Sequence, residues 1–524
     1  MPLLTSAMHT RPESEVNPFP SRRSVVHSAK GIIASSQPLA TACGVEILRK
    51  GGNCADAAVA VATKKVHSLN GSGRAGASCT LEAVREELGL MDGQEGKIPL
   101  HSVHAVTVPG TAAGWVDTVE LFGSGKVSLE EILEPAIKLA EEGFPVSELA
   151  AFSWKESEDK LRQASPNSSE MLKKDPSAKD GFRAPQPGEI MKNPTLANTF
   201  RLLAKHKKAG FYTGPVAEAL VTVVQDLGGY LTLEDLKHHM ETGTEKTEPI
   251  KFNFKAHDVA ETHGISKFSP EEHNSVRYLH VVIEALRIAF SDANWWVSDL
   301  IFSQVPAKAL LDPKYIAERA AIFSPEKAAD ICLHGLPVHS SSDTVYFAVT
   351  DSEGNGISFI NSNYHYFGTG IIPEGCGFPL QNRGANFVLQ PSNHPNILAP
   401  RKRPYHTIIP ALVTNASDQS LHSVYGVKGG FMQPQGHVQV LLNQLVFRLD
   451  PQAALDSPRF CIGPGMTNKS LKRLGHKVEL LKGRSREMFG TGQVIRFHVD
   501  VVDGQGVWSA GSDQRGDGAA VPVI

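Results

Sequence analysis

The sequence has little cysteine, and its cysteines do not cluster. Six cysteines are spread over 524 residues, and no two of them are separated by only two residues. Zinc fingers and ribbons use such close pairs, and small disulfide-stabilised scaffolds have a much higher cysteine density. We therefore expect neither kind of protein. The six positions, which we interpret as buried thiols, are Cys43, Cys54, Cys79, Cys332, Cys376 and Cys461.

A strong net charge and a long apolar run near the start are also lacking. The formal charge is only −3, so the chain has no basic surplus that would attract nucleic acid or an anionic membrane. Residues 1–23, MPLLTSAMHTRPESEVNPFPSRR, contain no uninterrupted apolar stretch of the kind found in signal peptides and membrane anchors. We expect a flexible tail over 1–23, a cytoplasmic protein and a small-molecule partner, with neither nucleic acid nor membrane as a partner.

The rest of the composition is that of a large folded protein. Hydrophobic residues make up 41% and charged residues 20% of the chain, as in globular proteins with a substantial core. At about 150 residues per domain, the length allows two to four domains or one large α/β body.

The first two thirds of the chain are predicted to be mainly helical. Residues 24–37 have the pattern of two strands joined by a turn, after which apolar periodicity and capping residues predict helices. Ser128 and Glu131 form the clearest signal, a capping box. The predicted helices cover 39–52, 53–65, 128–143, 195–210, 215–229 and 278–293. Residues 241–275 are polar and weakly patterned, which is typical of a surface excursion.

The last third changes to short β-type runs separated by glycine, asparagine and aspartate. Strands are predicted at 344–351, 356–362, 411–414, 421–426 and 494–500, and a helix at 435–447. The first two strands, TVYFAVTD and GISFINS, are joined by a turn within DSEGN, which is a strong hairpin signal. Thr344 is therefore expected to be the first residue of a strand.

Four blocks, in this order, carry a resemblance to a known family. They are GIIASSQPLATACGVEILRKGGNCADAAVA, AVTVPGTAAGWVD, DTVYFAVTDSEGNGISFINSNYHYFGTGI and the glycine pair of GGFMQPQGH. Over residues 24–518 the chain resembles the γ-glutamyltransferase family, in particular its hydrolase-like branch. The resemblance implies an α/β fold, a four-layer αββα sandwich of the N-terminal-nucleophile hydrolase type, built from two subunits of one cleaved precursor.

The resemblance also places the nucleophile at Thr344 and the cleavage site between Asp343 and Thr344. A threonine hydroxyl is a weak nucleophile, but an α-amino group on the same residue, with a pKa near 8, can take its proton. Only a chain terminus offers that amine. Cleavage would divide the chain into a large subunit region, 24–343, and a small one, 344–524, that share one core. Without the surrounding blocks, Thr344 would simply be a β-branched residue that opens a strand.

Further site residues follow from the same resemblance. Gly429 and Gly430 match a pair whose N–H groups stabilise the oxyanion, although a turn before the following helix explains them equally well from the residues alone. Ser362 matches a hydroxyl residue beside the nucleophile, or is a solvent-facing strand serine. Arg74 matches an arginine that binds a substrate carboxylate, or is a surface arginine.

Some positions depart from the family pattern. The segment QNRGANF places Asn386 where an acidic residue binds the α-ammonium of γ-glutamyl substrates, and Arg383 precedes it. Losing that charge forfeits on the order of 1.5 to 3 kcal/mol. His406 and Thr407 replace an expected serine pair. We expect Arg74, Arg383, Asn386, His406 and Thr407 to bind substrate, with a γ-glutamyl amide such as glutathione, oxamate or a glutaryl amide as alternatives, and hydrolysis favoured over transfer.

The sequence predicts neither a metal nor a cofactor. His365, His406 and His437 lack carboxylates or cysteines at ligand spacing around them. Two family segments are also missing. One is a strand segment before the block that contains Arg74, and the other is a glycine-rich segment near residue 260. Their loss leaves open an inactive or unprocessed family member, and a homo-oligomer is left open too.

Overall fold

The computed structural model describes residues 21, 23–58, 66–178, 180–251, 268–329, 344–462, 471, 473–476 and 478–524. The predicted tail, apart from residues 21 and 23, lies outside the described residues, as do Cys332 and Asp343. The structural statements below concern the described residues.

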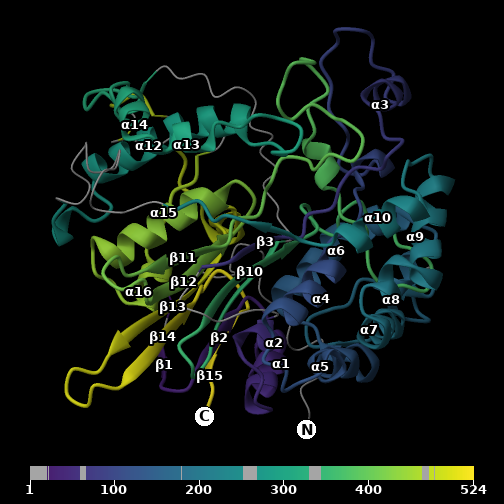
Figure 1. Ribbon diagram of the computed structural model, residues 1–524, viewed down its shortest axis with the longest axis horizontal. Helices are drawn as coiled ribbons and strands as arrows, with labels where there is room; N and C mark the ends of the chain where they lie inside the picture. Colours follow the sequence, from purple (N-terminus) through teal and green to yellow (C-terminus); the bar gives the residue numbers. More distant parts are fainter. Residues whose placement is uncertain are drawn as a thin grey trace.

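Two antiparallel sheets stand face to face in the middle of the molecule (Figure 1). The five-stranded sheet has the order β1-β14-β13-β12-β11, and the four-stranded sheet has the order β10-β9-β2-β15. Their strands are β1 (Val26–Ser28), β2 (Ile32–Ser35), β9 (Thr344–Thr350), β10 (Gly356–Ser362), β11 (Ala411–Thr414), β12 (Leu421–Lys428), β13 (Thr491–Val499), β14 (Gly506–Ser512) and β15 (Ala519–Pro522). Both sheets combine strands from before and after residue 344.

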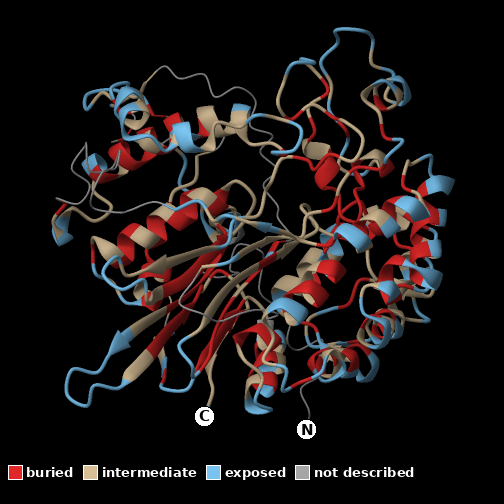
Figure 2. Cartoon of the chain, in the orientation of Figure 1, coloured by how far each residue is buried: buried red, intermediate tan, exposed pale blue. Residues whose placement is uncertain are grey.

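Apolar side chains from alternate strand positions fill the space between the two sheets. The four-stranded sheet contributes Ile32, Ala34, Tyr346, Ala348 and Ile360, and the five-stranded sheet contributes Val424, Ile495, Trp508 and Ala510. All of them are buried, so the inner faces of the two sheets form a continuous core (Figure 2).

Helices cover the two outer faces. On the four-stranded sheet, Ile33 and Val349 pack against α1 (Pro38–Arg49) and α2 (Cys54–Ala58). On the five-stranded sheet, α15 (Met432–Leu445) and α16 (Pro451–Asp456) pack through a second apolar cluster. The order of layers is therefore helix, sheet, sheet, helix, which confirms the predicted αββα sandwich.

A helical region flanks the sandwich, at the right of Figure 1, and α12 to α14 form a separate group at its upper left. The longer helices are α3 (Leu81–Glu87), α4 (Thr111–Phe122), α5 (Leu129–Glu142), α6 (Glu148–Ala164), α7 (Pro194–His206), α9 (Gly214–Asp226), α10 (Leu233–Thr242), α12 (Val276–Trp296) and α14 (Pro313–Ala320). The short ones are α8 (Ala209–Tyr212) and α13 (Ala307–Leu310). Small two-stranded sheets pair β3 (Ser68–Asn70) with β8 (Glu245–Thr247), β4 (Phe144–Pro145) with β7 (Ile190–Met191), and β5 (Lys173–Lys174) with β6 (Phe182–Arg183). No helix among the described residues is long and apolar enough to cross a bilayer.

Most of the predicted elements are confirmed, including the capping box formed by Ser128 and Glu131 at the start of α5. The sequence prediction missed β14 and β15. Within the polar stretch 241–275 the structure adds the short strand β8, while 252–267 lie outside the described residues. Among the described strands β10 is an edge strand of the four-stranded sheet. The five described cysteines are free, and three of them are buried.

Candidate active site

Thr344 and Ser362 face each other at the open end of a hairpin. Strands β9 and β10 pair in a register that sets Thr344 opposite Ser362, and the two side-chain oxygens lie 3.1 Å apart. Thr344 is buried, with 2% of its surface exposed. The N–H of Tyr364 donates to the Ser362 hydroxyl at 2.8 Å. Either hydroxyl can donate in the contact between Thr344 and Ser362.

The glycine pair lies at the same end of this hairpin. A Cβ atom on Gly356, at the opposite end, would touch Val424 of β12, whereas a Cβ atom on Gly426 would lie 2.5 Å from the ring of Tyr346. Strand β12 therefore runs across the hairpin toward Thr344 as its residue numbers rise. Gly429 and Gly430 follow directly after β12, beyond Gly426, so they lie toward the nucleophile end.

The backbone of this pair has a conformation that suits glycine. Gly429 has φ +134° and Gly430 has φ +55°, and a Cβ atom on Gly429 would lie 2.8 Å from the Cα atom of Gly490. Their carbonyl groups accept from the N–H groups of Met432 and Gln433, at the start of α15. Within the described part of the chain neither glycine N–H donates a hydrogen bond. The described protein therefore leaves both of these adjacent N–H groups without an acceptor.

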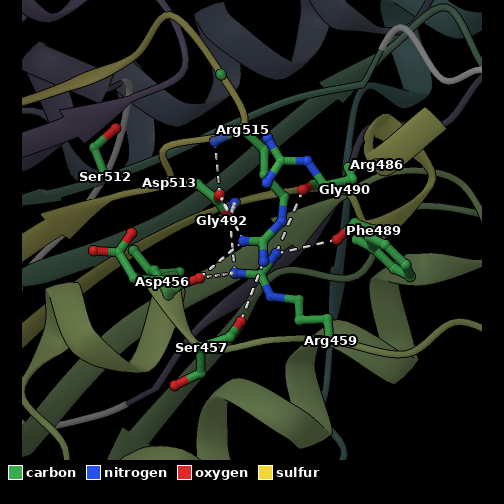
Figure 3. A network of polar contacts seen from close by, with 12 residues as sticks. Asp456, Ser457, Arg459, Arg486, Phe489, Gly490, Gly492, Ser512, Asp513 and Arg515 are labelled. Carbon is green, nitrogen blue, oxygen red and sulfur yellow. Dashed lines mark hydrogen bonds and ion pairs between the residues drawn. The ribbon is translucent and has the colours of Figure 1, made fainter. Parts of the chain in front are cut away.

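A buried ionic network fixes the segment against which Gly429 packs (Figure 3). The guanidinium of Arg459 donates to the carbonyls of Phe489 and Gly490 and pairs with Asp513 at 2.6 Å. Arg515 also pairs with Asp513, at 3.0 Å. Burial raises the pKa of Asp513, but the two guanidinium groups outweigh this effect and hold its pKa below the usual value.

Three of the predicted substrate-binding residues, Arg383, Thr407 and Asn386, are linked by hydrogen bonds to one another and to Ser362. Arg383 donates from Nε to the Thr407 hydroxyl at 2.9 Å and from Nη2 to the Ser362 carbonyl at 3.0 Å. The side-chain amide of Asn386 donates to the Arg383 carbonyl at 3.1 Å. Ile409, two residues after Thr407, donates its N–H to Gln433 at 3.1 Å. These contacts link the nucleophile hairpin to the helix that follows the glycine pair.

Arg74 is held in an ion-pair cluster. Its guanidinium pairs with Glu245 through one Nη atom and with Asp299 through the other, at 3.2 Å. Arg403 shares the same Glu245, at 2.6 Å, and its backbone N–H donates to Asp299 at 2.9 Å. Burial, and then Arg403, lower the pKa of Arg74. Two protein carboxylates thus already pair with the Arg74 guanidinium. Its predicted role in binding a substrate carboxylate stays a prediction.

A cleft of about 2670 Å³ runs along β10, and Ser362, Arg383 and His406 are among its lining residues. Its size exceeds that of a typical small-molecule site. Edge strand β10 forms one wall, with residues 354–363 all lining the cleft. The cleft therefore extends from Ser362 along the β10 edge of the four-stranded sheet.

His406 is a neutral group of this cleft. Burial, reinforced by Arg383 and Arg403, lowers the pKa of His406 to about 4. Its Nδ1 atom lies 3.4 Å from the Ser72 hydroxyl. Neutral imidazole at physiological pH adds no charge to the site.

Among the described residues, one group of side chains could hold a metal ion, and none of its members is a predicted site residue. The group consists of His280, Glu284 and His476. The two rings hydrogen-bond each other at 2.7 Å, His280 also bonds the carbonyl of Ser324, and Glu284 pairs with Arg287. These protein contacts satisfy the group internally. His437 is buried, and its ring packs edge-on against the ring of Tyr425.

Comparison with known proteins decides the family. A family model described as Gamma-glutamyltranspeptidase matches residues 61–523. The chain belongs to the gamma-glutamyltranspeptidase family. Members are N-terminal-nucleophile hydrolases and transferases, so the predicted family, fold and enzyme class are confirmed.

Relatives in this family cover nearly the whole chain. The glutathione hydrolase-like YwrD proenzyme of Bacillus subtilis is 32% identical over 95% of this chain and 99% of its own. The oxamate amidohydrolase proenzyme of Klebsiella pneumoniae is 28% identical over 94% of this chain and 98% of its own. The crystal structure of a cephalosporin acylase from Bacillus halodurans matches with a TM-score of 0.82 and 35% identity, over 98% of this chain and 99% of that one.

Sequence reasoning missed the partners of the predicted arginines. Glu245 and Asp299 are 171 and 225 positions from Arg74, and no local pattern marks either of them. Tyr364, with φ +76°, was also missed. The Tyr364 N–H donates to the Ser362 hydroxyl. A positive φ at a residue other than glycine is uncommon, and no local sequence pattern marks it here.

Proposed function

We propose that this chain is the precursor of an amide hydrolase whose nucleophile is Thr344. The observation that carries the proposal is the buried Thr344 hydroxyl, 3.1 Å from Ser362 at the head of β9, with the glycine pair toward the same end of the hairpin. In maturation the Thr344 oxygen attacks the carbonyl of Asp343, and the C–N bond breaks as an ester forms. Water then hydrolyses the ester, leaving a carboxylate on Asp343 and a free amine on Thr344.

The mature enzyme repeats this chemistry on a substrate amide. The new α-amino group accepts the hydroxyl proton of Thr344 while the oxygen attacks the substrate carbonyl. The N–H groups of Gly429 and Gly430 donate to the resulting oxyanion, and Ser362 donates to the nucleophile oxygen. The proton then passes to the leaving amine, and water releases the acyl group. Both halves, 24–343 and 344–524, stay together because each contributes strands to both sheets.

Mass spectrometry of the purified protein tests maturation directly. We expect two fragments, the smaller beginning at Thr344, together with turnover of at least one amide among γ-glutamyl p-nitroanilide, glutaryl p-nitroanilide and oxamate. Thr344→Ala should give one intact chain without turnover. Thr344→Ser, which keeps the hydroxyl, should retain cleavage. A wild-type chain that stays intact and hydrolyses none of the three amides would overturn the proposal and favour an inactive family member.

A substrate without an α-ammonium is the second candidate within this function, and a specific contact favours it. The Asn386 side chain is a neutral amide that donates to the Arg383 carbonyl and hydrogen-bonds the Tyr364 hydroxyl. A neutral amide attracts an ammonium far less than a carboxylate does. Glutaryl p-nitroanilide should therefore be hydrolysed at least as well as γ-glutamyl p-nitroanilide, and a strong preference for the γ-glutamyl compound would reject this candidate.

A further inference from the structure

Arg383 is a buried cation beside the proposed nucleophile that has no carboxylate partner. It is 8% exposed, and its hydrogen bonds go to a hydroxyl and a carbonyl, those of Thr407 and Ser362. No ion pair involves Arg383 within the described part of the chain, whereas Arg74 and Arg403 share Glu245 and Asp299. Arg74 and Arg403 are thus neutralised by protein carboxylates, and Arg383 is not.

The neighbours of Arg383 supply no negative charge either. His406 is kept neutral by burial and by nearby arginines, which lower its pKa to about 4. Asn386 and Thr407 are uncharged. Burial lowers the pKa of Arg383 to about 10, which leaves the guanidinium charged at neutral pH. A buried charge without a partner is costly, so this site favours a ligand that brings the missing anion.

The guanidinium also has donors to spare. Of its five N–H bonds, one on Nε and one on Nη2 have protein acceptors, and Nη1 has none within the described residues. The side chain is among the residues that line the cleft. Its Nη2 atom donates to the carbonyl of Ser362, whose hydroxyl lies 3.1 Å from the Thr344 oxygen. Ser362 thus contacts both the Arg383 guanidinium and the proposed nucleophile.

We propose that Arg383 binds the carboxylate of the acyl group, so that the substrate class is the half-amides of short dicarboxylic acids without an α-ammonium. Arg74, in this assignment, is a structural residue that holds Glu245 and Asp299. The inference rests on the proposed function for the identity of the scissile bond. The binding of the carboxylate itself is independent of catalysis and can be measured alone.

The first experiment compares hydrolysis of three p-nitroanilides that differ only in the acyl group. Glutaryl p-nitroanilide carries the carboxylate, its methyl ester lacks the charge, and γ-glutamyl p-nitroanilide adds the ammonium. We expect the wild-type kcat/KM for the glutaryl compound to exceed that for the ester by roughly 10- to 100-fold, the range for a charge-assisted hydrogen bond. Arg383→Gln should remove this preference, so that its kcat/KM for the glutaryl compound falls roughly 10- to 100-fold further than its kcat/KM for the ester. Arg383→Lys should restore part of it.

Arg201→Gln is the matched control, since Arg201 is an exposed arginine on α7 that pairs with Glu141. It should behave as wild type on all three compounds. Equal losses on the glutaryl compound and its ester in Arg383→Gln would overturn the inference, as would a tenfold wild-type preference for the γ-glutamyl compound over the glutaryl one. Thermal denaturation of each variant establishes that it is folded, and Arg383→Lys serves as the test if Arg383→Gln does not fold.

The second experiment separates this inference from the proposed function. Isothermal titration with glutarate, the free diacid, measures carboxylate binding without any turnover. We expect wild-type protein to bind glutarate at least tenfold more tightly than Arg383→Gln does, and more tightly than it binds monomethyl glutarate. If the wild-type chain were uncleaved and inactive, this difference would still support the anion site. Equal affinities in wild type and Arg383→Gln would overturn it even for an active enzyme.

Discussion

Ser362→Ala is the substitution that best tests the geometry at the head of β9. It removes a hydroxyl 3.1 Å from the Thr344 oxygen and the acceptor of the Tyr364 N–H at 2.8 Å. A neutral hydrogen bond contributes about 1 kcal/mol net, so losing the one to the nucleophile should slow its attack about fivefold. The Tyr364 N–H would lose its acceptor, which should lower the free energy of unfolding by about 1 to 3 kcal/mol.

The assay follows precursor cleavage by mass spectrometry and amide turnover by p-nitroaniline release, with urea denaturation for stability. Ser362→Thr should recover much of both rates, because it restores the hydroxyl. Ser153→Ala is the control, as Ser153 lies on α6 and donates only to the carbonyl of Leu149 in its own helix. If Ser362→Ala cleaved and turned over within about twofold of wild type, the inferred hydrogen bond to the nucleophile would be refuted.

Three further predictions follow from the same site. Gly429→Ala should lower kcat by at least about 100-fold, which is the loss measured for removal of an oxyanion donor. The new Cβ atom would lie 2.8 Å from the Cα atom of Gly490 and would displace the Gly429 N–H. A near-normal kcat would exclude the glycine pair as the oxyanion site. Asp513→Asn should lower the unfolding free energy by about 3 to 5 kcal/mol in urea, since it leaves the buried Arg459 without its partner, and a loss below about 1 kcal/mol would contradict this. Burial lowers the pKa of His437 to about 3, so the unfolded state binds a proton that the folded state does not. Stability should therefore fall by up to about 2 kcal/mol between pH 7 and 5, and His437→Gln should reduce that slope; an unchanged slope would show that His437 does not contribute.

The sequence by itself determined the local elements of this protein. The hairpin before and after DSEGN, the position of Thr344 at the head of a strand and the capping box at Ser128 and Glu131 were all predictable. These features depend on residues within a few positions of one another, which is the range over which turn chemistry, capping and side-chain alternation act. The ordered family blocks extended this to the four-layer sandwich.

Tertiary structure decided the charges of the candidate site. The sequence assigned the substrate carboxylate to Arg74 and gave Arg383 only a general substrate-binding role. Only the fold brings Glu245 and Asp299 to Arg74 and leaves Arg383 buried without a carboxylate in the described chain. Likewise the direction in which β12 crosses the hairpin sets the place of Gly429. Ion pairing and desolvation depend on distances of a few ångströms between residues far apart in the chain, and no local pattern encodes those distances.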